Sequence, residues 1–477
     1  MKNIRLILIG VILSILSGVL LSLSFLQIGL GFFMWFALVP VMIADFKLAR
    51  NRWQFGIFFG IMIITWLEIY WWVLPVTWIK IAPIFVGITM VMVVSPLKRI
   101  LEWHNYCLFI PLSAVAGVTI DLLNSFTPTG NISSFATTQS TYPVVIQIAS
   151  LFGIHSITFL LISNNALISL IIIKFAVLRK YKWQIIGSLT LLFLSLLLGI
   201  IHLNYLAEKS IPVAAVQQGT DDSFSKDSFS KPINKAALIG ARLVVLPECS
   251  YLIDNELSFE DYAGTWKSLA ARNNIYLIAP YGLCSGIPGM NLAINRNMAV
   301  LVSPDGRIGT PYAKHHIVKI LGEDWESGIT YPVFATKVGT LGIMICYDGY
   351  YPDVARKLAA KGVSLIAMPS NGVTPGLSRR ISTAVIPFRA VENGVGIVIS
   401  DRLGGAMIID PFGRILKQAP KESDAIIKDN LPVNKYQTFY TQYGYVFPYL
   451  CLIIFMIIFI QTIPYQISSY DIKQCNL

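Results

Sequence analysis

The sequence predicts a membrane protein in two parts, an α-helical bundle of about eight spans and an extramembrane α/β domain. Hydrophobic residues make up 55% of the 477-residue chain and charged residues only 13%, and the mean hydropathy is +0.63, which lies outside the range of soluble proteins. Long apolar runs fill the chain before residue 205, whereas shorter apolar runs alternate with polar helical segments after it. We therefore expect all spans but one in residues 1–204, the α/β domain in residues 205–440, and a last span with a short cytoplasmic tail in residues 441–477.

Each predicted span is an apolar run bounded by polar or turn-forming residues. The first follows Lys2 and Arg5 and lacks a cleavage site of small residues, so we expect it to stay in the protein rather than to be removed as a signal peptide. The spans are residues 6–25, 30–44, 55–73, 81–94, 106–122, a stretch ending near residue 173, 183–203 and 445–463.

The basic residues form clusters in every second loop between these spans. Although the formal net charge is +11, this pattern is typical of loops that stay in the cytoplasm and argues against a basic face that binds nucleic acid. The topology then places the α/β domain on the outer face. The clusters are Lys2 and Arg5; Lys47, Arg50 and Arg52; Lys98 and Arg99; and Lys174, Arg179, Lys180 and Lys182.

Two polar features interrupt the apolar pattern. Residues 121–143 are rich in Ser, Thr, Gly and Pro, so they form either a re-entrant, substrate-lining loop or an ordinary exposed connector. Glu68 lies beside Trp66, Tyr70 and Trp71, and this aromatic cluster favours a position at the membrane interface over a functional role.

The outer segment shows the alternation of strands and helices that is typical of an α/β domain. Turn signals at residues 303–306 and 410–413 predict two chain reversals. Helices are expected at residues 262–273 and 352–361. Strands are expected at residues 213–217, 243–246, 276–279, 298–302, 342–346, 364–368, 396–399 and 406–409.

Three chemically capable residues follow predicted strands: Glu248, Lys314 and Cys346. A cysteine attacks an acyl group as the thiolate, so it needs a base to take its proton and a donor to stabilise the oxyanion. Glu248 could be the base and Lys314 the donor. Taken singly, each residue also fits a structural role, as a helix cap, a solvated lysine and a buried core thiol.

The cysteines and histidines predict no metal site and no cofactor. Six cysteines and five histidines are dispersed without paired spacing, which indicates neither a zinc site nor a disulfide framework. The adjacent His315 and His316 would point to opposite faces of a strand and so would not chelate a metal. No histidine stands in a Cys/His/Asn arrangement of the kind used by thiol proteases.

Three motifs in order resemble the signatures of the nitrilase, or carbon–nitrogen hydrolase, superfamily. They are Leu246-Pro247-Glu248, Tyr312-Ala313-Lys314-His315 and Ile345-Cys346-Tyr347-Asp348, supported by residues 388–394 and 409–414. This resemblance covers roughly residues 212–420. It implies an αββα sandwich and a catalytic triad of Glu248, Lys314 and Cys346.

With its preceding and closing spans, the whole chain resembles the membrane-bound apolipoprotein N-acyltransferase family. The resemblance implies supporting active-site roles for Glu323, Tyr347 and Asn371. It further implies transfer of an acyl chain from a phospholipid, through a thioester on Cys346, to the N-terminal amine of a diacylglyceryl-cysteine lipoprotein. The expected protein is a monomer in the bacterial cytoplasmic membrane, with its catalytic domain on the extracytoplasmic side and no cofactor.

Several family segments near the pocket are replaced in this sequence. The Asn-Asp-x-Trp-Phe-Gly segment retains only Asn371, the Asn-Thr-Gly turn is replaced at residues 400–405, and a Glu-x-x-Arg element is reduced to Asp121. The reaction type is therefore better indicated than the donor and acceptor. Two alternatives stay open, a membrane-anchored amidase and a catalytically silent binding relative, although the intact set of three residues argues against the second.

Overall fold

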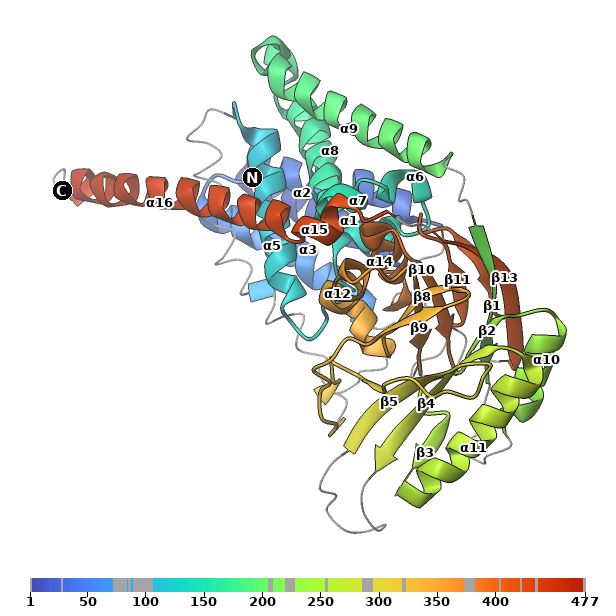
Figure 1. Cartoon of the computed structure of the whole chain (residues 1–477). Coiled ribbons are helices and arrows are strands. Elements are labelled where there is room, and N and C mark those ends of the chain that lie inside the picture. The colour runs from blue at the N-terminus through green and yellow to red at the C-terminus, as the bar shows by residue number, and fades with distance from the viewer. Residues whose placement is uncertain are drawn as a thin grey trace.

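The computed structural model describes residues 2–26, 29–71, 84, 87–88, 106–204, 209–218, 228–253, 256–284, 295–319, 323–372, 382–402, 405–420, 423–433 and 436–474. Figure 1 shows a helical region, formed by the N-terminal part and the C-terminal helix, beside an α/β domain with two sheets. The predicted division of the chain into apolar helices and a strand-rich segment is thus present in the structure.

Among the described residues, five helical stretches are long and apolar enough to cross a membrane: residues 3–25, 31–48, 52–69, 155–173 and 175–203. Shorter apolar helices cover residues 109–125, 143–152 and 446–461. The predicted span at residues 81–94 lies almost entirely outside the described residues. The helices are α1 (Lys2–Phe25), η1 (Gly31–Trp35), α2 (Val39–Ile43), η2 (Ala44–Leu48), α3 (Arg52–Trp71), α5 (Phe109–Ser125), η4 (Phe135–Gln139), α6 (Pro143–Ile146), α7 (Ala149–Phe152), α8 (His155–Ile173), η5 (Phe175–Tyr181), α9 (Lys182–Leu203), α15 (Phe439–Tyr443) and α16 (Val446–Gln474).

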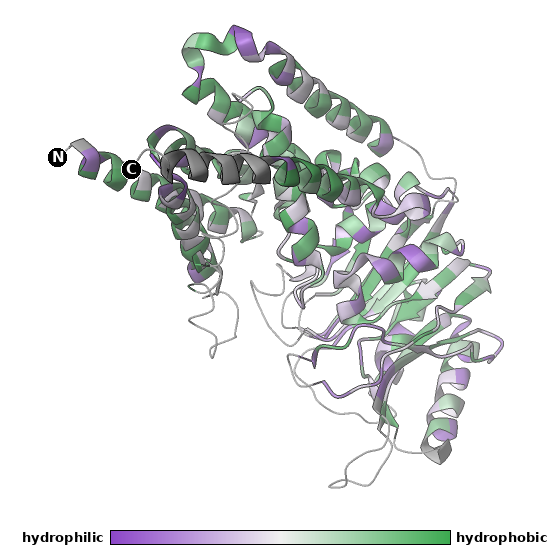
Figure 2. Cartoon of the chain, turned by 90° about the vertical axis from the view of Figure 1, so that its left-hand side faces the viewer, coloured by the Kyte–Doolittle hydropathy of each residue, from purple (hydrophilic) through white to green (hydrophobic). Residues whose placement is uncertain are grey.

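Helices α5 and α8 pack against each other in opposite directions. Phe109, at the start of α5, lies in one apolar cluster with Leu170, near the end of α8, while Asp121 near the end of α5 contacts His155 at the start of α8. In Figure 2 most of the helical region has the green of hydrophobic residues, and the purple of hydrophilic residues is more frequent in the α/β domain. Apolar side chains exposed along α9 are those expected of a helix in contact with lipid.

The described residues of the α/β domain form two sheets. The first has strand order β13-β1-β2-β4-β5-β6, with β3 paired to β4, and the second has order β12-β11-β10-β9-β8-β7. The strands are β1 (Lys209–Gln217), β2 (Leu243–Val245), β3 (Tyr251–Ile253), β4 (Tyr276–Cys284), β5 (Asn295–Val302), β6 (Tyr312–Ala313), β7 (Val333–Thr336), β8 (Gly339–Ile343), β9 (Leu365–Pro369), β10 (Gly396–Ser400), β11 (Met407–Ile409), β12 (Ile415–Gln418) and β13 (Ala425–Val433).

Alternation along the strands explains why the sheets stack. In β1, Val213 and Ala215 belong to the core shared with the second sheet, whereas Ala214 and Val216 pack against helices on the other face. Successive strand residues point to opposite faces, so a strand buried on both faces reads as a continuous apolar run. The result is an αββα sandwich with helices on both outer faces.

The outer helices are α10 (Ser230–Leu238) and α11 (Glu256–Asn273) on the first sheet, and α12 (Pro352–Ala360) and α14 (Ile386–Asn393) on the second. The predicted helices at residues 262–273 and 352–361 correspond to α11 and α12. Both predicted reversals are present as well: Gly306 N donates to Ser303 O at 2.9 Å, and Gly413 N donates to Asp410 O at 2.9 Å.

The strand predicted at residues 342–346 is wrong at its end. Strand β8 ends at Ile343, and Cys346 instead begins the short 3-10 turn η7 (Cys346–Tyr350). The Asp348 carboxylate accepts a hydrogen bond from Ile345 N at 2.9 Å, and Asp348 N donates back to Ile345 O at 3.0 Å. This local pairing turns the chain away from the sheet before the thiol is reached.

Candidate active site

Glu248 lies just beyond the end of β2, in the interior of the domain. Its side chain is buried, and its backbone N donates to Ser370 O at 3.2 Å, which joins the ends of β2 and β9. A carboxylate in this position is costly unless it is paired and hydrogen-bonded. The surroundings of Glu248 supply both kinds of partner.

Lys314 lies directly after β6 and is only 1% exposed. Its Nζ donates to Glu248 Oε1 at 3.1 Å and to the two carboxylate oxygens of Glu323 at 3.0 and 3.1 Å. Glu323 is in turn held by Val318 N, which donates to its Oε2 at 2.9 Å. The structure therefore brings three of the predicted site residues into direct contact, with one ammonium between two carboxylates.

Charge governs the protonation of Lys314. Burial alone would lower the pKa of the Lys314 ammonium, but the charges of Glu248, Cys346 and Glu323 outweigh burial and hold that pKa well above its ordinary value. Lys314 therefore stays cationic at neutral pH. A fixed cation beside a thiol favours the thiolate and can stabilise an oxyanion.

Asn297 is a residue of this site that sequence reasoning missed. It lies in β5 and is buried. Its side-chain Nδ2 donates to Glu248 Oε1 at 2.6 Å, and its backbone carbonyl accepts from the backbone N of Lys314 at 2.9 Å. Asn297 thus fixes both members of the ion pair at once. The sequence could have revealed it. Strand residues alternate between two faces, and Asn297 is on the same face as Ala299 and Leu301, which pack in the core between the sheets.

Cys346 stands at the first position of η7 with φ of 46°. This left-handed conformation is uncommon for a residue with a side chain, and it persists only where the surroundings impose it. The Cys346 side chain is half-buried. The segment of Lys314 and the turn of Cys346 are tied together through Asp348, which bonds to the backbone N of His315 and of Ile345.

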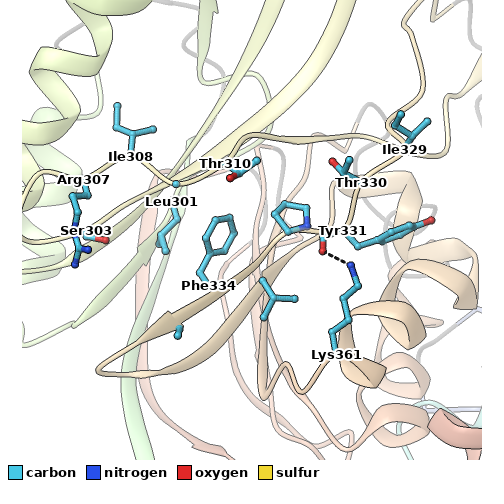
Figure 3. A pocket seen from close by; sticks show the side chains of 14 residues that line it. Leu301, Ser303, Arg307, Ile308, Thr310, Ile329, Thr330, Tyr331, Phe334 and Lys361 are labelled. Atoms are coloured by element: carbon cyan, nitrogen blue, oxygen red, sulfur yellow. Dashed lines mark hydrogen bonds between the residues drawn. The ribbon is translucent and has the colours of Figure 1, made fainter.

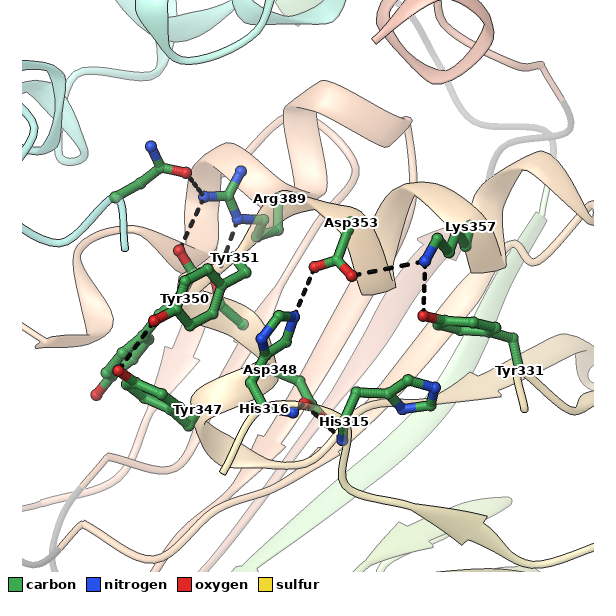
Figure 4. A network of polar contacts seen from close by, with 12 residues as sticks. His315, His316, Tyr331, Tyr347, Asp348, Tyr350, Tyr351, Asp353, Lys357 and Arg389 are labelled. Carbon is green, nitrogen blue, oxygen red and sulfur yellow. Dashed lines mark hydrogen bonds and ion pairs between the residues drawn. The ribbon is translucent and has the colours of Figure 1, made fainter. Parts of the chain in front are cut away.

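Asp348 joins the lysine segment to the cysteine turn. One of its carboxylate oxygens accepts from the backbone N of His315 (3.0 Å) and of His316 (2.8 Å), and the other accepts from Ile345 N and from Tyr312 Oη (2.7 Å). Figure 4 shows the Asp348 carboxylate next to the backbone of His315 and His316. Burial raises the pKa of Asp348, although these donors oppose the rise. The contacts set the distance between Lys314 and Cys346.

The remaining predicted residues lie around this centre. The Tyr347 hydroxyl donates to the carbonyl of Pro128 in the helical region and pairs with Tyr351 Oη at 3.0 Å. Asn371 is half-buried two residues past β9, next to Ser370, the residue that contacts the backbone of Glu248. The supporting roles given to Tyr347 and Asn371 stay predictions.

A second thiol, Cys249, directly follows Glu248. It also has positive φ, at 51°. Burial, followed by the charge of Glu248, raises the pKa of the Cys249 thiol far above its ordinary value. Cys249 is therefore protonated at neutral pH and unsuited to nucleophilic attack.

A cavity of about 780 Å³ opens between the edges of the two sheets. Figure 3 shows Leu301 and Phe334 on its walls, with Lys361 Nζ donating to Tyr331 O at 2.9 Å. Of the described residues that line it, none is Glu248, Lys314 or Cys346. This cavity is distinct from the site described above. Among the described residues, no group of three or more His, Cys, Asp or Glu side chains could hold a metal ion.

Two family models match the chain. The carbon–nitrogen hydrolase model matches residues 212–440, and the apolipoprotein N-acyltransferase N-terminal domain model matches residues 17–167. These ranges correspond to the α/β domain and to much of the helical region.

Individual relatives agree with these matches. The chain is 26% identical to an apolipoprotein N-acyltransferase of Geobacter metallireducens, over 92% of this chain and 93% of that protein. It is 25% identical to the Thermotoga maritima protein of the same name, over 94% and 92%. It is 32% identical to a nitrilase of Pyrococcus abyssi, over 42% of this chain and 76% of the nitrilase. The chain therefore belongs to the carbon–nitrogen hydrolase family, as a membrane-bound member that is similar over nearly its whole length to apolipoprotein N-acyltransferases.

Proposed function

We propose that the protein transfers an acyl chain from a phospholipid, through a thioester on Cys346, to the N-terminal amine of a diacylglyceryl-cysteine lipoprotein. One observation carries the chemistry: the buried Lys314 ammonium is held between Glu248 and Glu323, in a segment that Asp348 ties to the turn of Cys346. Similarity over nearly the whole chain to two apolipoprotein N-acyltransferases supports the choice of substrates.

In the first half-reaction Glu248 takes the proton of the Cys346 thiol, and the thiolate sulfur attacks the ester carbonyl of the phospholipid. The carbonyl oxygen becomes an oxyanion next to the Lys314 ammonium, which stabilises it. The carbon–oxygen bond of the ester then breaks. Protonated Glu248 returns its proton to the departing oxygen, so a lysophospholipid leaves and an acyl thioester remains on Cys346.

In the second half-reaction the neutral amine of the lipoprotein attacks the thioester carbonyl. Glu248 takes a proton from the attacking nitrogen, Lys314 again faces the oxyanion, and the carbon–sulfur bond breaks to give the amide. The thiolate that leaves recovers the proton from Glu248. Because a thiolate is a good leaving group, the same residue serves both half-reactions.

In this proposal residues 205–440 act as a monomeric catalytic domain on the extracytoplasmic side of the bacterial cytoplasmic membrane, attached to spans in residues 1–204 and 441–477. The antiparallel arrangement of α5 and α8 supports the orientation. Lys174, at the end of α8, lies 4.1 Å from the Tyr106 ring just before α5, at the end of this helix pair away from the α/β domain. Basic residues are expected at the cytoplasmic ends of membrane helices, so this basic end fits a cytoplasmic position, with the catalytic domain on the opposite side.

The orientation has a direct test in Cys107, which is exposed at that basic end. In a variant that keeps only Cys107, a membrane-impermeant maleimide should label the protein only after the membrane of spheroplasts is permeabilised. Equal labelling of intact and permeabilised spheroplasts would place the basic end outside and reverse the proposed topology.

The reaction is tested with the purified protein and a phospholipid labelled in its acyl chain. We expect a label on the protein that neutral hydroxylamine removes, that is absent in Cys346→Ser, and that persists in Cys249→Ala as the matched control. A diacylated lipopeptide should then receive the label as an amide. Absence of protein labelling with phospholipids of varied head group would count against the acyltransferase.

The same assay separates the alternative of a membrane-anchored hydrolase. Release of the label as free fatty acid in the presence of the lipopeptide, or release of ammonia from amides, would favour hydrolysis. In that case water rather than the amine attacks the thioester, while the roles of Glu248, Lys314 and Cys346 stay the same.

A further inference from the structure

The turn that carries Cys346 is held from outside the α/β domain. Residues 126–134, which connect α5 to η4 and are called the clamp loop below, lie against it. The Tyr347 hydroxyl donates to Pro128 O, and the Tyr351 hydroxyl donates to Thr127 O at 3.2 Å. These contacts join residues 219 and 224 positions apart in the chain.

The backbone carbonyls at the end of the turn are held as well. Asn131 N donates to Tyr350 O at 3.1 Å, and Asn131 Oδ1 accepts from Arg389 Nη2 at 2.7 Å. Arg389 Nε in turn donates to Gly349 O at 3.1 Å. Figure 4 shows the Arg389 guanidinium above the turn, joined to Tyr350 and to the side chain of the clamp loop. Asn131 and Arg389 therefore bind two successive carbonyls of the turn from the same side.

The backbone of Gly130 lies so close to the Tyr350 carbonyl that only a glycine fits at this position. Gly130 has φ of 54°, and a Cβ added there would lie 2.8 Å from Tyr350 O. A side chain at this position would push the carbonyl away from its donor. The absence of a side chain therefore permits the hydrogen bond between Asn131 and Tyr350.

The far end of the clamp loop is anchored in the helical region. Asp121 Oδ2, on α5, accepts from Ser134 Oγ at 2.8 Å and from Thr158 Oγ1 at 2.7 Å, and lies 3.0 Å from His155 Nδ1. All four residues are buried. The clamp loop is thus fixed to α5 and α8 at its base and to the nucleophile turn at its tip.

A strained residue needs support on both sides. Asp348 holds the beginning of η7 from within the α/β domain, whereas Arg389 and the clamp loop hold its end. Because Cys346 keeps a left-handed conformation only where its surroundings impose it, release of either end lets the thiol move relative to Lys314. We infer that Asn131 is a positioning residue for Cys346, so that the helical region completes the geometry of the nucleophile instead of only attaching the domain to the membrane.

The inference rests on the proposed function for the role of the thiol, but its test does not require a lipid. The full-length protein in detergent is treated with iodoacetamide, and the rate of Cys346 alkylation is followed by mass spectrometry from pH 5 to 9. Asn131→Ala should lower the rate at pH 7 by about 10- to 100-fold and move the midpoint of the pH profile, because small displacements in an active site have effects of this size. Asn124→Ala is the matched control: Asn124 lies at the end of α5, and among the described residues its Nδ2 donates to Ser133 Oγ of the clamp loop.

Two further variants separate positioning from folding. Asn131→Asp keeps the oxygen that accepts from Arg389, and Asn131 Nδ2 has no hydrogen-bond partner among the described residues, so this change should restore most of the alkylation rate. Gly130→Ala should slow alkylation, whereas Gly240→Ala, at a glycine of positive φ with open space around it, should not.

An alkylation rate and pH profile of Asn131→Ala within twofold of the unchanged protein would overturn the inference. So would a variant in which acylation by phospholipid is lost while alkylation is normal, since the clamp loop would then act on the lipid rather than on the thiol. If Asn131→Ala does not fold, equal rates for Gly130→Ala and Gly240→Ala would overturn it. If the unchanged protein takes no label from phospholipid but Asn131→Ala still slows the alkylation of Cys346, the inference is supported and only the proposed function is contradicted.

Discussion

Two buried clusters of charge in the α/β domain differ in how their charges are balanced. In the first, Lys314 faces two carboxylates, Glu248 and Glu323. In the second, Arg389 faces the single carboxylate of Glu392, and both side chains are fully buried. The first cluster has more negative charge than its cation neutralises and lies beside a thiol, so it can accept a proton. The second is closed, because its donors and acceptors are used by carbonyls and amides of neighbouring segments.

The contacts of Glu392 show what the closed cluster does. Its Oε1 accepts from Ile154 N of the helical region at 2.8 Å, and its carbonyl accepts from the Thr438 hydroxyl just before α15. Glu392 therefore joins α14 to the residue before α8 and to the residue before α15. We therefore interpret the cluster around Lys314, which has excess negative charge, as catalytic, and the balanced pair of Arg389 and Glu392 as structural.

The largest effect is expected for Glu248→Gln. The amide keeps the shape of the side chain and an oxygen that can accept from Lys314 and Asn297, but it cannot take the thiol proton. The rate of thioester formation in a single turnover should fall by about 10³- to 10⁴-fold, while the protein stays folded. Glu326→Gln, in an exposed pair with Arg296, should leave the rate unchanged. Substantial activity in Glu248→Gln would move the base to another residue.

Arg389→Met should have its main effect on stability. It leaves the Glu392 carboxylate buried without its ion partner, which costs about 3–5 kcal/mol, and the loss can be measured by thermal unfolding in detergent. The double variant Arg389→Met/Glu392→Met should recover most of the loss, because removal of both charges leaves no unpaired ion. Equal unfolding temperatures for the single and double variants would contradict the interpretation of the pair as a balanced structural cluster.

A smaller effect is expected for Glu323→Gln. Glu323 is partly exposed, and Glu248 alone still pairs with Lys314 in the variant. We expect thioester formation to slow by about tenfold, which corresponds to roughly 1.4 kcal/mol. The second half-reaction should slow by a similar factor, because the same ammonium faces both oxyanions. A loss as large as that of Glu248→Gln would make Glu323 a proton acceptor rather than a support for Lys314.

The smallest effect concerns His315, a half-buried titratable group whose Nδ1 lies 3.0 Å from the Tyr312 hydroxyl. Burial lowers the pKa of His315 from 6.5 to about 4, so the folded protein keeps it neutral while the unfolded chain takes up a proton. Its contribution to stability is present above pH 6.5 and is lost as the pH falls towards 4. His315→Gln should therefore reduce the loss of unfolding temperature between pH 7 and pH 5. An identical loss in both proteins would show that other groups carry the acid sensitivity.

Much of the α/β domain could be predicted because its central strands are apolar on both faces. Residues 243–246 and 364–368 read directly as buried strands, and β2 and β9 occupy nearly these positions. Strand β6 contains only two residues, which is too short for any periodic signal, and β3 is as short as β2 but is not extended by a further apolar residue as β2 is by Leu246. Strand β13 pairs with β1 across the ends of the domain, and this long-range pairing leaves no local pattern.

The motifs pointed to Glu248 and Lys314, and the family resemblance to Glu323; the structure brings these three side chains into contact, while their catalytic roles stay a prediction. The apolar residues before Cys346 concealed the turn that begins there, because Ile345 looks like a strand residue while its N–H bonds to Asp348. The clamp loop remained undecided between two interpretations, since its partners follow more than 200 positions later and no local sequence pattern encodes them.

The contact between Pro128 and Tyr347 has a consequence for how the protein is made. The two residues lie 219 positions apart, and synthesis at about 5–20 residues per second separates them by roughly 10 to 40 s. The surface that holds the end of the cysteine turn is therefore translated long before the turn itself. The order of translation therefore lets the cysteine turn fold against a surface of the same chain that has already been made.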